Sequence, residues 1–284
     1  MKVGIQLFSV RLAMKKDPLA TIKAVADKGY RYIEVANHQA DQDNGVGFGV
    51  GASEIKKVLE DTGAQIFSAH IFPFTPEIAV SVIKYHETIG TKYIAHPLDF
   101  FKDYDEVLRK SEMMNKVGEI YTNAGITFMY HNHFHEFQIF KGKTIMDIMA
   151  ENTDPKYVHF ELDTYWTLRG GQDPVETLKK FGTRVRLIHQ KDFPAEYQDK
   201  INLIDPVHKD NIEVTREYFR TVVDPKTFTE IGTGILPIQD YINTGNAVCK
   251  SDYIILEQDH SLHDELESIS ISMESFRKFQ GIEW

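Results

Sequence analysis

The sequence predicts an α/β protein that closes as a (β/α)8 TIM barrel, and two regularities in its 284 residues lead to that fold. Short apolar stretches with the composition of buried parallel strands alternate with stretches of helical periodicity, and eight such units follow one another. A glycine stands before several strand candidates, where a left-handed residue ends the preceding helix. Eight regular units favour closure over an open, doubly wound sheet, and such barrels commonly use about 250 residues. Residues 1–284 are therefore expected to form one domain.

The individual elements follow from apolar runs, helix caps and glycine stops. The strand candidates are Val3–Phe8, Tyr32–Ala36, Gln65–Ala69, Tyr93–His96, Ile126–Tyr130, Val158–Leu162, Val185–His189 and Tyr253–Glu257. The helix candidates are Pro18–Lys28, Ala52–Thr62, Pro76–Ile89, Asp103–Asn123 and Pro174–Phe181. The first strand candidate is not followed by the G-x-G-x-x-G motif of dinucleotide-binding folds.

One segment, at about 191–236, does not fit the alternation. It contains several charges and the prolines Pro194, Pro206 and Pro225. A connection of this length inside a compact domain is usually functional. We expect a long loop insertion that serves as a lid or as a contact between subunits.

Composition limits the class of partner. Lys and Arg total 32 against 42 Asp and Glu, which gives a net charge of -10, whereas a nucleic-acid-binding protein needs a basic surface. The single cysteine excludes an internal disulfide framework. No signal peptide is recognisable, and no stretch of about 18 apolar residues could span a membrane. The sequence therefore predicts a soluble, cytoplasmic protein that binds neither nucleic acid nor membrane.

Polar side chains gather where the predicted strands end. The carboxyl ends of barrel strands meet at one mouth, and this is where barrel enzymes place their chemistry. A single polar residue at a strand end is more often a helix cap or a polar group whose hydrogen bonds are made within the fold. Seven strand ends that converge favour a functional site instead. The residues are Glu34, Asn37, His38, His70, His96, His131, Asn132, His133, Asp163, His189, Lys191, Asp192, Glu257, Asp259 and His260.

The densest cluster is His131-Asn132-His133-Phe134-His135-Glu136-Phe137, directly after the fifth strand candidate. It holds three histidines and a carboxylate. Imidazole and carboxylate groups together suit a divalent ion of the Mn, Co, Zn or Mg type. The mouth of the barrel is therefore predicted to hold one divalent metal.

Several motifs, taken in order and with their places on the strands, resemble the sugar phosphate isomerase/epimerase family with the xylose isomerase-like barrel. Ketose 3-epimerases, hydroxypyruvate isomerases, inosose dehydratases and endonuclease IV belong to this group. The resemblance covers essentially the whole chain. The motifs are Tyr32-Ile33-Glu34, HNHFHEF at 131–137, ELDTYW at 161–166, GGQDP at 170–174, HQKD at 189–192, EIGTG at 230–234 and LEQD at 256–259.

The resemblance implies a metal held by residues that follow strands five to eight. Asp163, His189 and Glu257 match the last three family ligands. The family has a Glu after strand five, whereas this chain has His131. We expect Glu136 to fold back as the fourth ligand, with His131 or water as alternatives; a solvated loop carboxylate is the structural alternative for Glu136.

The resemblance further implies a metal-dependent isomerase or epimerase that removes a proton next to the carbonyl of a sugar or cyclitol. Glu257, His131 and Glu136 are the expected catalytic residues. Glu34, His70, His133 and Lys191 are expected to contact the sugar or polyol substrate.

Three alternatives stay open. A His after strand five could act as a general acid toward a leaving hydroxyl, which favours a dehydratase acting on a keto-sugar or inosose. An endonuclease IV activity is opposed by the net charge of -10. A sugar-binding barrel without catalysis is the alternative from another class. A homo-oligomer is compatible with the sequence.

Overall fold

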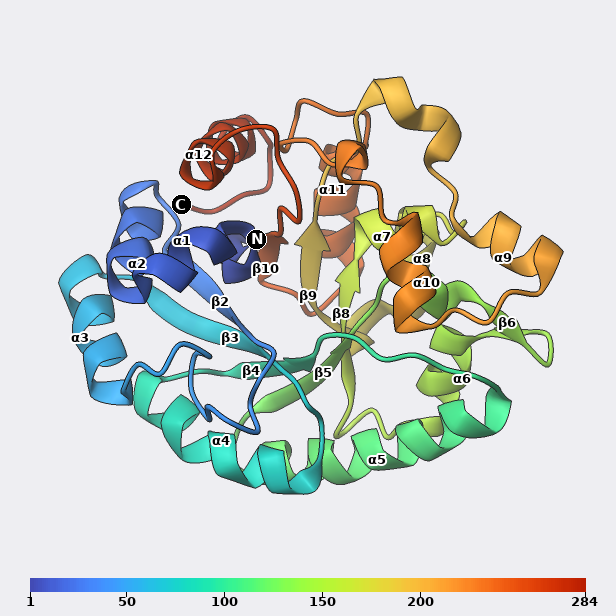
Figure 1. Ribbon diagram of the computed structural model, residues 1–284, viewed down its shortest axis with the longest axis horizontal. Coiled ribbons are helices and arrows are strands. Elements are labelled where there is room, and N and C mark those ends of the chain that lie inside the picture. Colours follow the sequence, from blue (N-terminus) through green and yellow to red (C-terminus); the bar gives the residue numbers. More distant parts are fainter.

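A computed structural model describes residues 1–284 and contains a closed barrel of eight parallel strands (Figure 1). Around the barrel the strands follow the order β1-β10-β9-β8-β5-β4-β3-β2, so neighbours in the chain are neighbours in the sheet. Their bounds are β1 Lys2–Gln6, β2 Tyr32–Asn37, β3 Gln65–Ile71, β4 Tyr93–His96, β5 Thr127–His131, β8 His159–Asp163, β9 Val185–Gln190 and β10 Tyr253–Leu256. The (β/α)8 barrel predicted from the sequence is confirmed.

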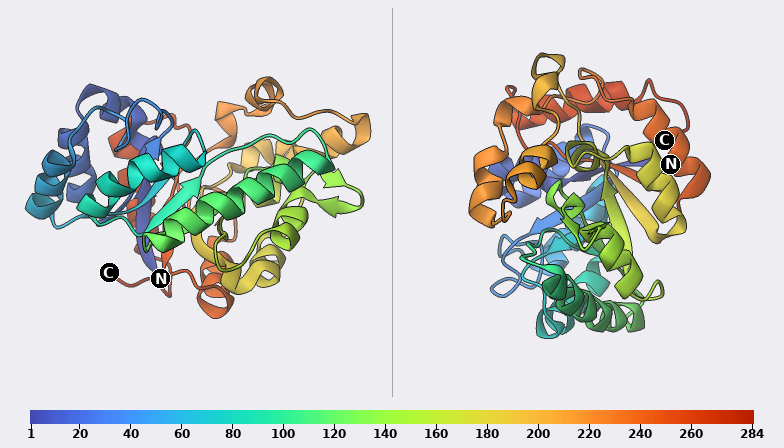
Figure 2. Two further views of the ribbon diagram at one scale, coloured as in Figure 1. Left: turned by 90° about the horizontal axis from the view of Figure 1, so that it is seen from below. Right: turned by 90° about the vertical axis from the view of Figure 1, so that its right-hand side faces the viewer.

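Helices form the outer layer, as both views in Figure 2 show. They are α1 Arg11–Lys16, α2 Pro18–Asp27, α3 Ala52–Thr62, α4 Pro76–Ile89, α5 Tyr104–Asn123, α6 Ile145–Asn152, α7 Thr164–Arg169, α8 Pro174–Phe181, α9 Ile204–Asp210, α10 Arg216–Val222, α11 Ile238–Val248 and α12 Glu265–Phe276. None of these helices is long and apolar enough to cross a membrane. The two ends of the chain lie together (Figure 2), because the Glu283 N–H donates to the Met1 carbonyl oxygen at 2.9 Å.

An apolar layer fills the barrel interior beneath the strand ends. It consists of Phe67, Ala95, Met129, Leu187 and Ile255, each at most 3% exposed. Side chains two positions apart on a strand face the same way. The residues two positions beyond Met129, Leu187 and Ile255 therefore also face inward, and they form the next layer toward the mouth.

Two irregularities in strand pairing lie next to inward-facing carboxylates. The β2–β3 register shifts between Ile33 and Glu34, and the β8–β9 register shifts between Phe160 and Glu161. Each shift leaves one residue of the partner strand without a paired residue on the neighbouring strand. In the first case this residue is Phe67 on β3. Bulges of this kind re-aim side chains and are common near active sites.

The predicted elements differ from the observed ones in several places, and helices α1, α7, α11 and α12 were not predicted. The first strand ends at Gln6, because Leu7–Val10 forms a 3-10 turn. After β5, a short hairpin of β6 (Ile139–Phe140) and β7 (Lys143–Thr144) precedes α6, a helix that was not predicted. The long 191–236 segment is not a structureless loop, since it contains α9 and α10.

A buried histidine makes stability depend on pH. His86 on α4 is fully buried, and burial lowers its pKa to about 4, against about 6.5 in an unfolded chain. Between these two values the unfolded chain takes up a proton that the folded chain does not. The free energy of unfolding should therefore fall as the pH drops from about 6.5 to about 4.

Urea unfolding at pH 7.5 and at pH 5 tests this expectation. His86→Gln should lose less stability between the two pH values than the wild type. The partly exposed His263 provides a control, and His263→Gln should behave as the wild type does. Equal losses for His86→Gln and the wild type would contradict the assignment.

Candidate metal centre

The carboxyl ends of the strands carry a layer of charged and imidazole side chains, each at most 7% exposed. β5 ends in His131 and β8 ends in Asp163, while His189 lies on β9 and Glu257 directly follows β10. The members are Gln6, Glu34, His70, His131, Glu161, Asp163, His189, Lys191 and Glu257. Buried ionisable groups at this density need partners of opposite charge or a metal.

One group of four residues offers two imidazole nitrogens and two carboxylate oxygens within 4.8 Å of one another. Its members are His131, Asp163, His189 and Glu257, and we call it the outer group. Asp163 is fixed as the N-cap of α7, where its Oδ1 accepts a hydrogen bond from the Trp166 N–H at 2.8 Å. A site of mixed nitrogen and oxygen donors suits Zn, Mn or Co.

Lys191 already places a positive charge between the two carboxylates of the outer group. Its Nζ donates to Asp163 Oδ2 at 2.6 Å and to Glu257 Oε2 at 2.5 Å, and its side chain is 1% exposed. Burial alone would lower the pKa of Lys191, but the nearby carboxylates raise it well above its usual value. The outer group therefore fits a cation both in its donor atoms and in its charge.

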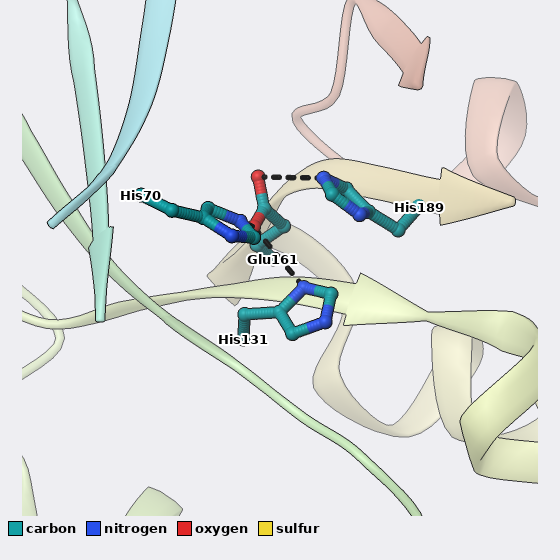
Figure 3. Close-up of side chains that lie close together, drawn as sticks. All are labelled: His70, His131, Glu161 and His189. Atoms are coloured by element: carbon teal, nitrogen blue, oxygen red, sulfur yellow. Dashed lines mark hydrogen bonds and ion pairs between the residues drawn. The ribbon is translucent and has the colours of Figure 1, made fainter. Parts of the chain in front are cut away.

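A second group, which we call the inner group, consists of His70, His131, Glu161 and His189 (Figure 3). Glu161 lies at its centre, and all three imidazoles point toward this carboxylate. Glu161 Oε2 lies 2.6 Å from His70 Nε2 and 3.1 Å from His131 Nδ1, and Oε1 lies 3.4 Å from His189 Nε2.

The two groups share His131 and His189, and each of these rings uses a different nitrogen for each group. His131 turns Nδ1 to Glu161 and Nε2 toward Glu257, at 4.0 Å. His189 turns Nε2 to Glu34 at 2.7 Å and Nδ1 to Glu257 at 3.1 Å.

The two shared imidazoles differ in charge. Burial lowers the pKa of His131 to about 4, so this ring is neutral near pH 7. Burial also opposes a charge on His189, but Glu161 and Glu34 raise the pKa of His189 well above its usual value. His131 thus has a lone pair free for a metal, whereas His189 without a metal carries a proton on each nitrogen.

Glu136 belongs to neither group. Its Oε1 accepts from the Tyr130 hydroxyl at 2.5 Å, and its Oε2 accepts from the His133 N–H at 2.9 Å. Glu136 is fully buried, so the alternative of a solvated loop carboxylate is wrong. The carboxylate instead fixes the loop that follows β5. His131 takes the place near Asp163, His189 and Glu257 that was expected for Glu136.

A cavity of about 500 Å³ opens above the outer group. Two of the four residues expected to contact substrate, His70 and His133, line it. The other two, Glu34 and Lys191, lie in the buried network beneath it. The cavity is lined by Phe8, His38, His70, Pro97, Leu98, His131, His133, Trp166, Phe219, Arg220, Val223, Pro225, Glu257, Asp259 and His260.

Two contributions to the site were not predicted from the sequence. Glu161 stands inside a strand rather than at its end, but its spacing of two from Asp163 places both side chains on the inward face. Phe219 comes from α10, which lies next to α7 (Figure 1). Its ring lies 5.3 Å from that of His133 and 5.6 Å from that of Phe134, between ring centroids. The 191–236 segment was expected to serve as a lid or a subunit contact, but no local pattern identifies Phe219 as the residue that packs at the mouth.

The fold and the outer group together define an α/β barrel with a site that could hold a divalent metal. Residues 22–279 match the family model of the xylose isomerase-like TIM barrel. The chain belongs to this family, and the resemblance stated from the motifs is confirmed.

Among curated proteins, the chain is similar to an inosose dehydratase from Geobacillus kaustophilus (strain HTA426). The two are 28% identical over 140 residues, which cover 49% of this chain and 40% of that protein. Two further inosose dehydratases, from Geobacillus thermodenitrificans and Clostridium perfringens, are covered over 53% and 34% of their length. The chain thus aligns with about a third to a half of the length of these relatives.

Solved structures share the fold over nearly the whole chain. A sugar phosphate isomerase/epimerase from Parabacteroides distasonis ATCC 8503 superposes with a TM-score of 0.78 at 24% identity, and the match covers 99% of this chain and 95% of that one. The IOLI protein with a bound zinc atom superposes with a TM-score of 0.68 at 12% identity, over 97% and 96% of the two chains. At these identities the likeness concerns the fold.

Replacement of Lys191 tests the charge balance of the outer group. Lys191→Met should leave Asp163 and Glu257 as buried carboxylates without their cation, at a cost of about 3–5 kcal/mol in the free energy of unfolding. Urea unfolding in the presence of a chelator measures this cost. Added Mn²⁺ or Zn²⁺ should then stabilise the variant more than the wild type, because the dication takes over the role of the ammonium group.

The exposed pair of Lys143 and Glu151 provides the control, since Lys143→Met removes a surface ion pair and should cost less than about 1 kcal/mol. Unchanged stability of Lys191→Met in chelator would show that the ammonium group does not balance these carboxylates.

Proposed function

We propose that the protein is a divalent-metal-dependent isomerase or epimerase that acts on a sugar or cyclitol by removing a proton next to a carbonyl. One observation carries the proposal: four metal-ligand side chains converge beneath a cavity large enough for a small molecule. Family membership and the fold shared with a sugar phosphate isomerase/epimerase support it.

The proposed ligands are His131, Asp163, His189 and Glu257. His131 replaces Glu136, because Glu136 is engaged by Tyr130 and the His133 backbone. Mn, Co, Zn or Mg is the proposed ion, and the zinc atom of the IOLI protein is in line with this range. When bound, the metal would supply a Lewis acid that polarises the substrate carbonyl.

Two carboxyl groups that line the cavity are the proposed proton carriers. Burial opposes ionisation of Glu257, but Lys191 and His189 hold the pKa of Glu257 well below its usual value. Burial raises the pKa of Asp259 to about 7. Glu257 is therefore ionised but a weak base in this network, whereas Asp259 is suited to exchange a proton near neutral pH.

A dehydratase that acts on a keto-sugar or inosose is the second candidate. The curated relatives are inosose dehydratases, and the end of β5 carries His131 and His133 where the epimerases resembled above carry a carboxylate at the first position. Loss of a hydroxyl group needs a proton donor in the site. Asp259 lines the cavity, and its pKa of about 7 suits it to donate that proton near neutral pH.

The reaction itself separates the two candidates. With the metal-loaded protein and keto-sugars or inososes in D2O, proton NMR would report deuterium incorporation next to the carbonyl for an isomerase or epimerase. A dehydratase would instead release water and produce an ultraviolet-absorbing enone. Absence of both changes across the panel would favour a sugar-binding barrel without catalysis.

Metal content tests the ligand set directly. Glu257→Gln and His131→Ala should each bind far less Mn²⁺ or Zn²⁺ than the wild type, because each removes a donor atom from the outer group. Glu136→Ala should retain its metal. Gel filtration would remove unbound ions, and mass spectrometry would then measure the metal content of each variant. Loss of metal from Glu136→Ala but not from His131→Ala would restore Glu136 as the fourth ligand.

Glu161 is proposed as a positioning residue that acts through the histidines. As a carboxylate it accepts a hydrogen bond from His131 Nδ1, and its Oε1 lies 3.4 Å from His189 Nε2, whose hydrogen bond goes to Glu34. These contacts leave His131 Nε2 and His189 Nδ1 for the metal. Carboxylates that orient metal-bound histidines in this way commonly contribute 10–100-fold to metal affinity.

Glu161→Gln should lower metal affinity by roughly 10–100-fold, because an amide offers only one oxygen acceptor to the three imidazoles. Competition with a fluorescent chelator measures this affinity without reference to activity. Glu230, a buried carboxylate bonded to Ser261 and Ser268, provides the matched control, and Glu230→Gln should keep wild-type affinity. Two bound metals per chain in the wild type and one in Glu161→Gln would instead identify the inner group as a metal site.

A further inference from the structure

The cavity above the outer group has two chemically distinct parts. Its floor carries the polar side chains of His131, Glu257 and Asp259. Another part of the lining is apolar and contains Leu98, Phe219, Val223 and Pro225, which we call the apolar wall. A sugar bound at the floor would contact only the polar part of the cavity.

Aromatic contacts hold Phe219 of the apolar wall in place. Its ring stacks on Phe134 with an angle of 14° between the planes, lies nearly perpendicular to the His133 ring and is tilted by 48° against Trp166. α10 is thereby packed onto the loop that follows β5. The wall is part of the folded site, and a ligand would find it already formed.

The size of the cavity leaves room beyond a sugar ring. A volume of about 500 Å³ corresponds to roughly 17 water molecules at about 30 Å³ each. A hexose has a dozen non-hydrogen atoms, so a single ring on the floor would leave the apolar wall in contact with water. Exposed apolar surface next to a polar site commonly marks the binding region of an apolar group.

The charges around the cavity do not favour a phosphate in this part. Arg220 is the single Lys or Arg side chain of the lining, it is exposed, and the lining also contains the carboxylates of Glu257 and Asp259. Recognition of phosphate usually combines several donors, such as paired arginines or a helix N-terminus. An uncharged, apolar group is therefore the better match for the wall.

We propose that the substrate is a sugar or cyclitol that carries an aryl or branched alkyl substituent, and that this substituent binds against Leu98, Phe219 and Val223. The proposal rests on the proposed function, because it places the sugar ring at the outer group. It adds the substrate class, a glycoside or ether of a keto-sugar in place of a free monosaccharide or a sugar phosphate.

Paired ligands test the proposal. Calorimetric titration of the Mn²⁺-loaded protein would compare methyl and phenyl glucosides, as both anomers, with glucose 1-phosphate. The phenyl compound of at least one anomer should bind at least about tenfold more tightly than its methyl partner, which corresponds to about 1.4 kcal/mol. Equal binding of the pair, no binding of either phenyl anomer, or tightest binding of glucose 1-phosphate would each overturn the proposal.

Variants locate the effect on the wall. Val223→Thr keeps the volume of the side chain but adds a hydroxyl group, so it should reduce the phenyl preference several-fold while the affinity for the methyl glucoside stays unchanged. Phe219→Ala should remove most of the preference. Val80→Thr makes the same change on the surface of α4, where Val80 is 63% exposed, and should leave the preference unchanged. A preference that survives in both wall variants would overturn the assignment.

The metal content of the same samples separates this proposal from the proposed function. Protein that binds Mn²⁺ but shows no phenyl preference would overturn the substituent site alone. Protein that binds no metal would overturn the proposed function, and the substrate class with it.

Discussion

The balance of buried charge at the barrel mouth is the constraint on which the site depends. The four carboxyl groups of Glu34, Glu161, Asp163 and Glu257 are each at most 7% exposed. Burial of so many acidic groups would be prohibitive without cations beside them. Lys191 and His189 supply those cations through direct contacts with the carboxylates. A dication bound in the outer group would join this balance, so metal binding, side-chain protonation and stability are coupled in one network.

The fold and the convergence of strand-end residues could be predicted from the sequence, because barrel topology determines where strand ends meet. Asp163, His189 and Glu257 come together as the spacing of the strands required. Glu136 was predicted to lie at the metal, but the structure has it in the loop after β5. A loop side chain can point in several directions, and here the hydrogen bonds with Tyr130 and the His133 backbone determine the direction. Periodicity alone cannot report such contacts.

Glu161 and Phe219 were missed for different physical reasons. Glu161 sits within a strand, and only its phase relative to Asp163 reveals that it faces inward. Phe219 lies in a segment whose short helices gain most of their stability from packing rather than from propensity. Its position depends on aromatic contacts with residues far away in the sequence, which no local pattern encodes.

The register shift between β2 and β3 has a consequence for how the site tolerates change. Phe67 and His70 both face the barrel interior, since the Phe67 ring stacks on Tyr253 of the non-adjacent β10 and His70 contacts Glu161. Regular alternation would place two residues three positions apart on opposite faces of the strand. Because β3 has one extra residue, Phe67 can join the apolar layer while His70 joins the layer of imidazole side chains above it. A single-residue deletion on β3 would therefore turn one of the two layers outward, whereas a substitution there would leave both layers facing inward.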